Sequence, residues 1–465
     1  MVKSEKYDLL VVGGGPGGYV AAIRAAQLGM SVGLVEKEHL GGICLNWGCI
    51  PTKAMLRSAE IFSMLKKSND FGITAHDIGF DLEKIIDRSR KIAKQLSTGV
   101  KHLLHKNKVA VINGSGVLID QNSVQVKSKH LLKDLTASDI IIATGARARE
   151  LSGLESDGVL IWNYKHALRP NRMPKKMLIV GSGAIGVEFA SFYNSLGCDV
   201  TIIELKKRIL PNEDDDIATY AKKEFKNRGI KIYESAKIQS LKKKTGESIV
   251  DLSINNEVKS EVYDTIIMAT GVVGNIENIG LENVDIKVEH NHILTNEFCE
   301  TNVKNIYAIG DVSAAPWLAH KASHEGVLVA EKISGASVMP IGESSIAGCT
   351  FCEPQIASVG LTEEAARRKG YSLKVGKFPF VANGKALAIG DSSGFAKTIF
   401  DSKTGELLGA HLIGPEVTEL IHSFVIGKQL EGTDEDFFDT VFPHPTLSEA
   451  IHESVLNSSN RTIHF

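Results

Sequence analysis

Two cysteines offer the clearest chemistry in this chain, Cys44 and Cys49, which stand five residues apart in the segment GGICLNWGCIPTK. This spacing is too long for a C-x-x-C redox turn, and the segment lacks the second pair that a structural zinc site needs. Pro51 favours a helix that starts near Cys49, where the positive end of the helix dipole lowers the pKa of a thiol. The pattern predicts a redox pair with a reactive thiolate at Cys49, and the alternative is two ordinary buried thiols.

A glycine-rich turn occurs twice, each time after a short apolar run. The glycines are Gly13, Gly15 and Gly18 in the first turn and Gly181, Gly183 and Gly186 in the second. After each turn come a stretch of helical length and a β-branched run that ends in an acid, Glu36 or Glu204, 23 residues after the first glycine. The repeated order of strand, turn, helix, strand and acid predicts two Rossmann-like units, each binding a dinucleotide.

The second acid bears on which nicotinamide cofactor is used. Glu204 favours the 2′-hydroxyl of NAD, because a 2′-phosphate would be repelled there. The basic residues that follow keep NADP open; they are Lys206, Lys207 and Arg208. The alternative is that this basic triplet lies in a solvated loop balanced by the next acids, Glu213, Asp214, Asp215 and Asp216.

Further buried runs end in glycine turns. Residues 139–145 and 264–271 both finish in Ala-Thr-Gly, which predicts strands that complete the two nucleotide-binding sheets. Residues 306–311 finish in Gly-Asp, and Asp311 either binds a sugar or ribityl hydroxyl or simply caps a turn. From about residue 346, alternating apolar segments and then helical ones predict an α+β domain with an antiparallel sheet.

Composition sets the limits within which these sites operate. A length of 465 residues suggests about three domains. Six cysteines are too few for a disulfide-held secreted fold, and the apolar run at residues 9–12 is too short for a signal peptide, so we expect a cytoplasmic protein. A net charge of −2 argues against nucleic acid or a membrane as partner. We predict no metal site.

Together with HPTLSE at residues 444–449, these motifs resemble the flavin disulfide reductase family, the class I pyridine nucleotide-disulfide oxidoreductases, over residues 7–460. The resemblance implies an α/β fold with two Rossmann-like dinucleotide-binding domains and a C-terminal α+β dimerisation domain. It implies an FAD-binding domain at residues 1–147, an NAD-binding domain at 148–271, a central domain completing the FAD site at 272–345 and a dimerisation domain at 346–465.

The resemblance also implies roles for single residues. Cys44 and Cys49 form the redox disulfide, with Cys49 stacked on the flavin and Cys44 exchanging with the substrate. His444, held by Glu449, is the general base and reaches the disulfide of the partner subunit. Lys53 lies beside the flavin ring and pairs with Glu188. The other implied cofactor-binding residues are Gly13, Gly15, Gly18, Glu36, Gly116, Thr144, Gly145, Asp311 and Ala319 for FAD, and Gly181, Gly183, Gly186, Glu204 and Gly271 for NAD.

Within the family, the chain is most similar to the branch that oxidises protein-bound dihydrolipoamide, with FAD as the flavin and NAD as the electron acceptor. This implies a homodimer that works with the lipoyl domains and core acyltransferase of 2-oxo acid dehydrogenase complexes. The alternatives are a glutathione or related disulfide reductase, and a component that serves mainly in the assembly of an acyl-transfer complex. Mercuric and large thioredoxin reductases fit less well. They use an added redox group at the C-terminus, whereas the last cysteine here is Cys352.

Some features depart from the family pattern or fall outside it. Residues 272–275 read VVGN where many relatives have Arg and Pro, and Phe442 replaces a histidine. Cys349 and Cys352 form a lone C-x-x-C, interpreted as incidental thiols. Residues 88–108 hold seven Lys or Arg and no acid, which predicts the basic outer face of a core-packed helix, or else a docking patch for an acidic partner. The apolar residues expected on its inner face are Ile92, Leu96, Val100, Leu103 and Leu104.

Overall fold

The computed structural model describes residues 5–129 and 132–465, which divide into two compact units. The first unit comprises Met1–Ala54, Glu83–Arg149 and Gly271–Ile341, and the second comprises Met55–Leu82, Glu150–Thr270 and Gly342–Phe465. The start of the chain considered above includes residues 1–4, which lie outside the described residues. Within the described ranges, no helix is long and apolar enough to cross a membrane.

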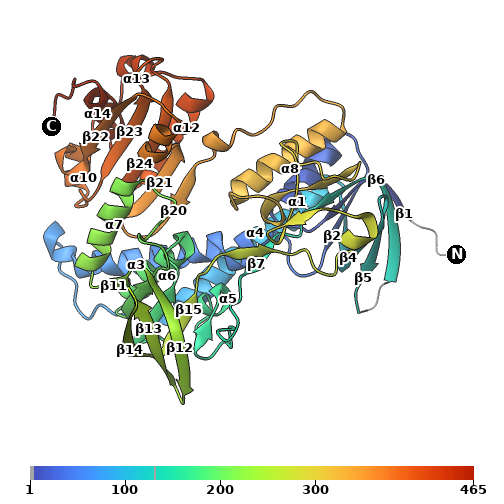
Figure 1. Cartoon of the computed structure of the whole chain (residues 1–465), viewed down its shortest axis with the longest axis horizontal. Coiled ribbons are helices and arrows are strands. Elements are labelled where there is room, and N and C mark those ends of the chain that lie inside the picture. Colours follow the sequence, from blue (N-terminus) through green and yellow to red (C-terminus); the bar gives the residue numbers. More distant parts are fainter. Residues whose placement is uncertain (1–4, 130–131) are drawn as a thin grey trace. The chain divides into compact units, whose positions relative to one another are not determined.

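The first unit is built on a seven-stranded sheet with a parallel centre (Figure 1). The parallel strands are β3 (Ala110–Asn113), β2 (Val32–Glu36), β1 (Glu5–Val12), β6 (Leu132–Ile142) and β19 (Ile306–Ala308), and the antiparallel β5 (Ser123–Lys127) and β4 (Ser115–Asp120) extend β6. Leu9 and Val11 face one core while Leu10 and Val12 face another, so both faces of β1 are buried. This explains its unbroken apolar run.

Two helices pack closely over one face of this sheet, α1 (Pro16–Gln27) and α8 (Ala319–Ile333). Their contact depends on glycine, because a Cβ atom at Gly326 would lie 2.6 Å from the Gly17 carbonyl oxygen. The alanine-rich sequence of α1, buried at Ala21, Ala22 and Ala25, allows the same close approach. The helix that follows the first glycine turn is therefore fixed between the sheet and α8.

The second unit repeats this architecture with a five-stranded parallel sheet. Its strands, in order, are β11 (Lys231–Tyr233), β10 (Asp199–Ile203), β9 (Lys176–Val180), β15 (Thr265–Met268) and β8 (Ile161–Trp162). The helix after β9 is α6 (Ala184–Ser195), and α7 (Asp215–Asn227) follows β10. An antiparallel meander is inserted before β15, namely β12 (Ala236–Lys244), β13 (Glu247–Ile254) and β14 (Glu257–Tyr263). The two predicted Rossmann-like units are confirmed, and both Ala-Thr-Gly segments supply the strand next to the first one.

The same unit holds the predicted C-terminal α+β domain, with five antiparallel strands. In order they are β20 (Gly348–Thr350), β21 (Gln355–Gly360), β24 (Leu407–Gly414), β23 (Phe395–Asp401) and β22 (Leu373–Pro379). The helices are α9 (Glu363–Arg368), α10 (Gly384–Ala388), α11 (Val417–Leu420), α12 (His422–Gln429), α13 (Asp434–Asp439) and α14 (Glu449–Ser458). Figure 1 shows α12, α13 and α14 beside this sheet. They bury Phe424, Phe437 and Ile451 against it.

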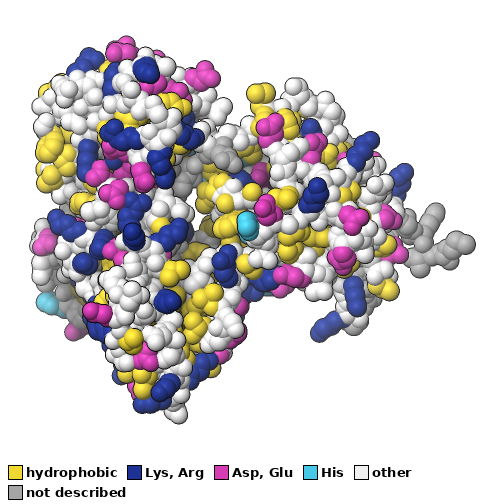
Figure 2. All heavy atoms as spheres, in the orientation of Figure 1, with side chains coloured by type: hydrophobic (Ala, Val, Ile, Leu, Met, Phe, Trp, Pro, Cys, Tyr) yellow, Lys and Arg dark blue, Asp and Glu magenta, His cyan; other side chains and the backbone are white. Residues whose placement is uncertain are grey.

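Shorter elements connect these layers. They are α2 (Gly42–Trp47), α3 (Cys49–Lys66), η1 (Ser68–Phe71), β7 (Ala146–Ala148), α5 (Tyr164–Ala167), β16 (Val272–Gly274), η2 (Leu281–Val284), β17 (Val288–Glu289), β18 (His292–Ile293), η3 (Gly310–Val312), η4 (Glu343–Ser345) and η5 (Phe380–Ala382). Basic and acidic side chains lie interspersed over the visible surface of each unit (Figure 2), as the near-zero net charge leads one to expect.

The basic segment at residues 88–108 forms most of α4 (Leu82–Lys106). Val100 and Leu104 are buried in the core as predicted, and the lysines of the helix point to solvent. The prediction was wrong for Leu96 and Leu103, which are 41% and 43% exposed. The buried stripe of α4 is narrower than its apolar sequence, because Ser89 and Ala93 complete it on the side toward the core.

Candidate active site

The two cysteines flank a sharp break between helices. Cys44 lies on α2, Gly48 adopts a non-helical conformation that ends α2, and Cys49 is the first residue of α3. Both side chains are in the thiol form and only partly buried. The predicted helix start at Cys49 is confirmed, so the positive end of the α3 dipole lies at its sulfur atom.

The two sulfur atoms are in contact but are electrostatically unequal. The hydrogen bond to Cys49 raises the pKa of the Cys44 thiol well above its ordinary value, burial raises it further, and the charge of Lys53 opposes the shift. Of the two thiols, Cys44 is therefore the one made harder to deprotonate by its neighbour. The separate roles of Cys44 and Cys49 that the resemblance implied stay predictions.

Helix α4 supports the cysteine segment from outside. The Arg90 guanidinium lies over the Trp47 ring at 4.7 Å, and Arg88 donates a 2.7 Å hydrogen bond to the Ala54 carbonyl oxygen. Ser97 donates to the Leu40 carbonyl oxygen at 2.9 Å. The inner face of the basic stretch thus fixes the loop that holds the thiols, a role that the charge pattern alone did not indicate.

In both glycine turns, the first and third positions leave no room for a side chain. A Cβ atom at Gly13 or Gly181 would lie 2.1 or 2.3 Å from the carbonyl oxygen of the neighbouring strand end. At the third glycine of each turn, Gly18 or Gly186, it would lie 1.9 or 2.1 Å from the oxygen of the first.

The second glycine of each turn faces open space. At Gly183 nothing lies within 4 Å of an added Cβ atom, and at Gly15 the nearest atom is 3.9 Å away. Each of these glycines also caps a helix, α1 or α6, whose N–H groups favour an anion. The two turns therefore fit a pyrophosphate in the same place.

Glu36 and Glu204, the acids that end the two β-branched runs, are held by hydrogen bonds in a similar way. Glu36 accepts backbone N–H groups from Gly14 at 2.7 Å and Glu38 at 2.7 Å, one on each oxygen. Glu204 accepts the Lys206 N–H at 2.8 Å on one oxygen, and the Ser182 hydroxyl at 2.6 Å on the other. Because each carboxylate oxygen has more than one acceptor position, both acids retain capacity for ribose hydroxyls.

The first Ala-Thr-Gly turn is held by a residue that the sequence reading left unexplained. Asn275 donates its side-chain amide to the Thr144 carbonyl oxygen at 2.9 Å, and the Thr144 hydroxyl donates to the Asn275 carbonyl oxygen at 2.8 Å. Gly145 and Gly271 both adopt positive φ with nothing within 4 Å of an added Cβ. Gly116 packs closely against Val12. Although residues 272–275 differ from the family pattern, the turn that they form with Thr144 is still held by hydrogen bonds.

Asp311 lies on η3, directly before the segment that leads into α8 at Ala319. Burial raises the pKa of its carboxyl, and the charge of Lys321 partly opposes this. A second acid, missed in the sequence, supports the same place: Glu325 accepts the Gly310 N–H at 2.7 Å and pairs with Lys321 at 2.5 Å. The only sequence signal for Glu325 is its spacing of one helical turn from Lys321.

Lys53 and Glu188 lie on α3 and α6, in different units. Glu188 is buried and accepts the Phe351 N–H at 2.9 Å. The implied pairing of these two residues stays a prediction. Cys352, beside Phe351, is fully buried, which raises the pKa of its thiol and agrees with an incidental role.

The predicted base has its carboxylate partner. His444 Nδ1 lies 2.9 Å from Glu449 Oε1, and Glu449 Oε2 accepts the Thr446 N–H at 2.9 Å. Partial burial acts to raise the pKa of Glu449, but these two partners outweigh it and hold that pKa below its ordinary value. An ionised Glu449 makes Nδ1 the donor and leaves Nε2 of His444 available as an acceptor. The His444 side chain is 78% exposed.

The basic triplet lies in a largely exposed loop, as the alternative interpretation had it. Lys206 and Lys207 are exposed. Arg208 pairs with Asp215 at 2.6 Å and donates to the Glu213 carbonyl oxygen at 2.8 Å, so the cation best suited to a 2′-phosphate is already engaged. Asp214 departs from this interpretation, because it is buried and binds Lys397, a residue far along the chain, at 2.8 Å.

The chain was compared with known proteins. Residues 7–326 match the pyridine nucleotide-disulphide oxidoreductase family, and residues 346–455 match its dimerisation domain. The chain belongs to this family. It is an oxidoreductase whose cofactors are FAD and NAD, and the dimerisation domain supports a homodimer.

The individual relatives carry more specific names than the family. The dihydrolipoyl dehydrogenase of Zymomonas mobilis is 52% identical over 465 residues, covering 99% of this chain and 100% of the relative. That of Rhizobium etli is 47% identical, covering 99% of each chain. Among solved structures, LpdA from Mycobacterium tuberculosis has a TM-score of 0.91 at 26% identity, covering 97% of this chain and 99% of that one.

Proposed function

We propose that this protein is a dihydrolipoyl dehydrogenase, which oxidises protein-bound dihydrolipoamide and passes the electrons through FAD to NAD. The observation that carries the proposal is the hydrogen-bonded pair of thiols at the start of α3, in which Cys49 raises the pKa of Cys44. The full-length relatives named above support the substrate.

The reaction starts from the Cys44–Cys49 disulfide. His444 Nε2 takes a proton from one thiol of the substrate, and the resulting thiolate attacks Cys44 Sγ. The bond between Cys44 and Cys49 breaks, and Cys49 leaves as the thiolate that the α3 dipole favours. The second substrate sulfur then displaces Cys44, which closes the lipoyl disulfide.

Two electrons now reside on the cysteine pair. One of the two substrate protons ends on Cys44, and the other leaves through His444. Bound FAD supplies the oxidant for this pair, and NAD removes the electrons. Glu449 holds the His444 ring throughout and stabilises its protonated form.

The cofactor sites are assigned by the same reasoning. We place FAD on the first turn, with Glu36 at its ribose, and on the groups around Thr144, Asp311 and Ala319. NAD is placed on the second turn, with Glu204 at its ribose. The domain bounds proposed are 1–147 for FAD, 148–271 for NAD, 272–345 for the central domain and 346–465 for dimerisation. The separate family match that starts at residue 346 supports the last of these boundaries.

For the assembled enzyme, we propose that His444 of one subunit serves the disulfide of the other, and that the dimer binds the lipoyl domains and core acyltransferase of 2-oxo acid dehydrogenase complexes. We also propose a cytoplasmic location, since a content of six cysteines in 465 residues suits a reducing compartment.

The test is anaerobic reduction of the purified holoenzyme, followed through its flavin spectrum. Dihydrolipoamide should reduce wild type rapidly, and Cys44→Ser should not respond to it. Both proteins should still bind FAD, because Cys44 is not among the groups that hold it. Rapid reduction by glutathione with none by dihydrolipoamide would instead identify a glutathione-type reductase.

A further inference from the structure

Helix α14 carries two histidine–glutamate pairs rather than one. Glu449 and Glu453 lie one turn apart on this helix, so their side chains project from the same face. His444, from the segment before the helix, binds Glu449, and His464, from the segment after it, places Nδ1 2.6 Å from Glu453 Oε1. Only the first pair has a role in the mechanism above.

The second pair is firmly built. The Glu453 side chain is 8% exposed, and its other oxygen accepts the Ile463 N–H at 3.3 Å. The segment that carries His464 is fixed by a hydrogen bond from Asn457 to Thr462 at 2.9 Å. It is also fixed by the ring of Phe465, which packs edge-on against Phe378 of β22 at 6.2 Å. His464 thus has a defined position at the end of α14.

A buried carboxylate favours a charged partner. The hydrogen bond to Glu453 raises the pKa of His464 above its ordinary value, and the nearby charge of Glu449 adds to the shift. In turn, His464 is one of the groups that lower the pKa of Glu449. The two pairs therefore interact electrostatically.

Several charges near this pair have partners of their own. Arg461, in the segment that follows α14, lies over the Phe438 ring at 4.4 Å. Lys374 and Lys377 of β22 bind Asp434 and Asp216, and Lys397 of β23 binds Asp214. On α13, Asp436 accepts hydrogen bonds from Thr433. His452, on α14 itself, stacks on Phe442 and contacts the Phe438 carbonyl oxygen. The charges that act on His464 are those of Glu453 and Glu449.

We propose that His464 is a positioning residue for the reaction: as a cation held on Glu453, it sets the pH range over which His444 works as the base. The proposal rests on the proposed role of His444. A positive charge beside the first pair makes a second positive charge on His444 less favourable. The His444 ring therefore stays neutral, and able to accept a proton, down to a lower pH.

The test compares pH profiles of kcat/KM for dihydrolipoamide oxidation by the full-length holoenzyme. His464→Gln should move the ionisation of the base to higher pH by about half a unit at low ionic strength. The shift should shrink in about 1 M salt, because His464 is exposed and its charge is screened. A structural role would leave a change that salt does not reverse.

Two further variants sharpen the comparison. His464→Lys restores a cation and should return the profile toward that of wild type. His290→Gln removes another exposed histidine beside an acid, Glu289, in the other unit, and should leave the profile unchanged. An unshifted profile for His464→Gln, or a shift that His464→Lys does not rescue, would overturn the proposal.

A direct readout separates this inference from the proposed function. The His444 imidazole can be titrated by NMR in wild type and in His464→Gln, without turnover. If His444→Gln retains normal activity, the base assignment fails, yet the NMR shift still reports the coupling. If His444→Gln loses activity and the NMR titration is unchanged by His464→Gln, only the present inference fails.

Discussion

At the scale of single residues, the proposed reaction depends on one imidazole nitrogen. Glu449, itself held by the Thr446 N–H, engages Nδ1 of His444, so Nε2 is left as the ring atom that can accept a proton in the proposed reaction. We expect His444→Gln to slow dihydrolipoamide oxidation by roughly 10²-fold or more, because a substrate thiol must then lose its proton to water. Stopped-flow reduction of the flavin by dihydrolipoamide measures this.

The same variant offers an internal control. Reduction by NADH does not require a thiol to be deprotonated, so its rate should stay near that of wild type. Equal losses in both half-reactions would point to a folding or assembly defect rather than to a lost base.

How much of the site the sequence could predict depended on the residue type. Cysteines, repeated glycines and a histidine followed by a glutamate are few and carry specific chemistry, so their spacing was informative. Asn275 and Glu325 were not found, because amides and acids are common and their importance comes from partners, Thr144 and Gly310, that lie far away in sequence. Only folding brings such pairs together.

At the scale of elements, two glycines of the second turn are expected to have different roles, Gly183 in ligand binding and Gly186 in folding. Gly183→Ala adds a methyl group into open space, where the pyrophosphate is expected, so it should raise the KM for NAD by roughly 10-fold or more with an unchanged melting temperature. Gly186→Ala places the same group 2.1 Å from the Gly181 oxygen and should lower stability by about 1–3 kcal/mol. Equal effects of the two variants on melting would contradict this division.

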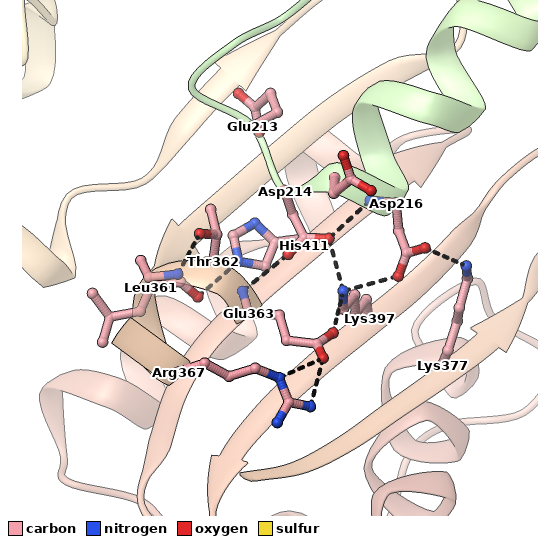
Figure 3. A network of polar contacts seen from close by, with 12 residues as sticks. Glu213, Asp214, Asp216, Leu361, Thr362, Glu363, Arg367, Lys377, Lys397 and His411 are labelled. Atoms are coloured by element: carbon pink, nitrogen blue, oxygen red, sulfur yellow. Dashed lines mark hydrogen bonds and ion pairs between the residues drawn. The ribbon is translucent and has the colours of Figure 1, made fainter. Parts of the chain in front are cut away.

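A cluster of ion pairs around one buried lysine joins α7 to the C-terminal sheet. The Lys397 ammonium is buried and binds Asp214 at 2.8 Å, Asp216 at 2.9 Å and Glu363 at 2.8 Å. Figure 3 shows these acids turned toward Lys397, with His411 beside them. Asp214 also caps the first turn of α7 and accepts the Glu363 N–H at 3.0 Å. One ammonium group therefore neutralises acids from two elements.

Removing that cation should be costly. Lys397→Met leaves Asp214 buried without its counter-charge, which should lower the free energy of unfolding by about 3–5 kcal/mol. Urea denaturation measures the loss, and Lys377→Met, which removes a half-exposed partner of Asp216, is the matched control with an expected cost of about 0–1 kcal/mol. A similar cost for both variants would mean that burial is not what matters.

The cluster also predicts a pH dependence. Burial lowers the pKa of His411 below its ordinary 6.5, so the folded state resists a proton that the unfolded chain accepts. Stability is complete above about pH 6.5 and falls as the pH drops below it. Lys397 outweighs burial and lowers the pKa of Asp214, which adds a second loss below about pH 4.

His411→Gln isolates the first of these losses. Between about pH 7 and pH 5, its melting temperature should fall less than that of wild type, because no ring remains to be protonated. Parallel curves for the two proteins would exclude His411 as the source.

At the scale of the whole molecule, the sequence predicted the two sheets because each begins with the same pattern of strand, glycine turn, helix and strand, although β19 and β15 come from farther along the chain. It gave no sign that Met55–Leu82 packs in the second unit, where the ring of Phe71 lies against Gly390. Such packing depends on the shape of a distant surface, and a local apolar pattern does not encode it.

The dimer provides the last test, because a site shared between subunits gives a distinctive result when two inactive variants are mixed. Cys49→Ser lacks the thiolate but keeps its base, and His444→Gln lacks the base but keeps its thiols. In a mixed dimer, one site combines both defects and the other combines two intact contributions. Random exchange of equal amounts makes half of the dimers mixed, so activity should recover to about a quarter of the wild-type value. Subunits that each carry a complete site of their own would show no recovery, since every site would then retain one of the two defects.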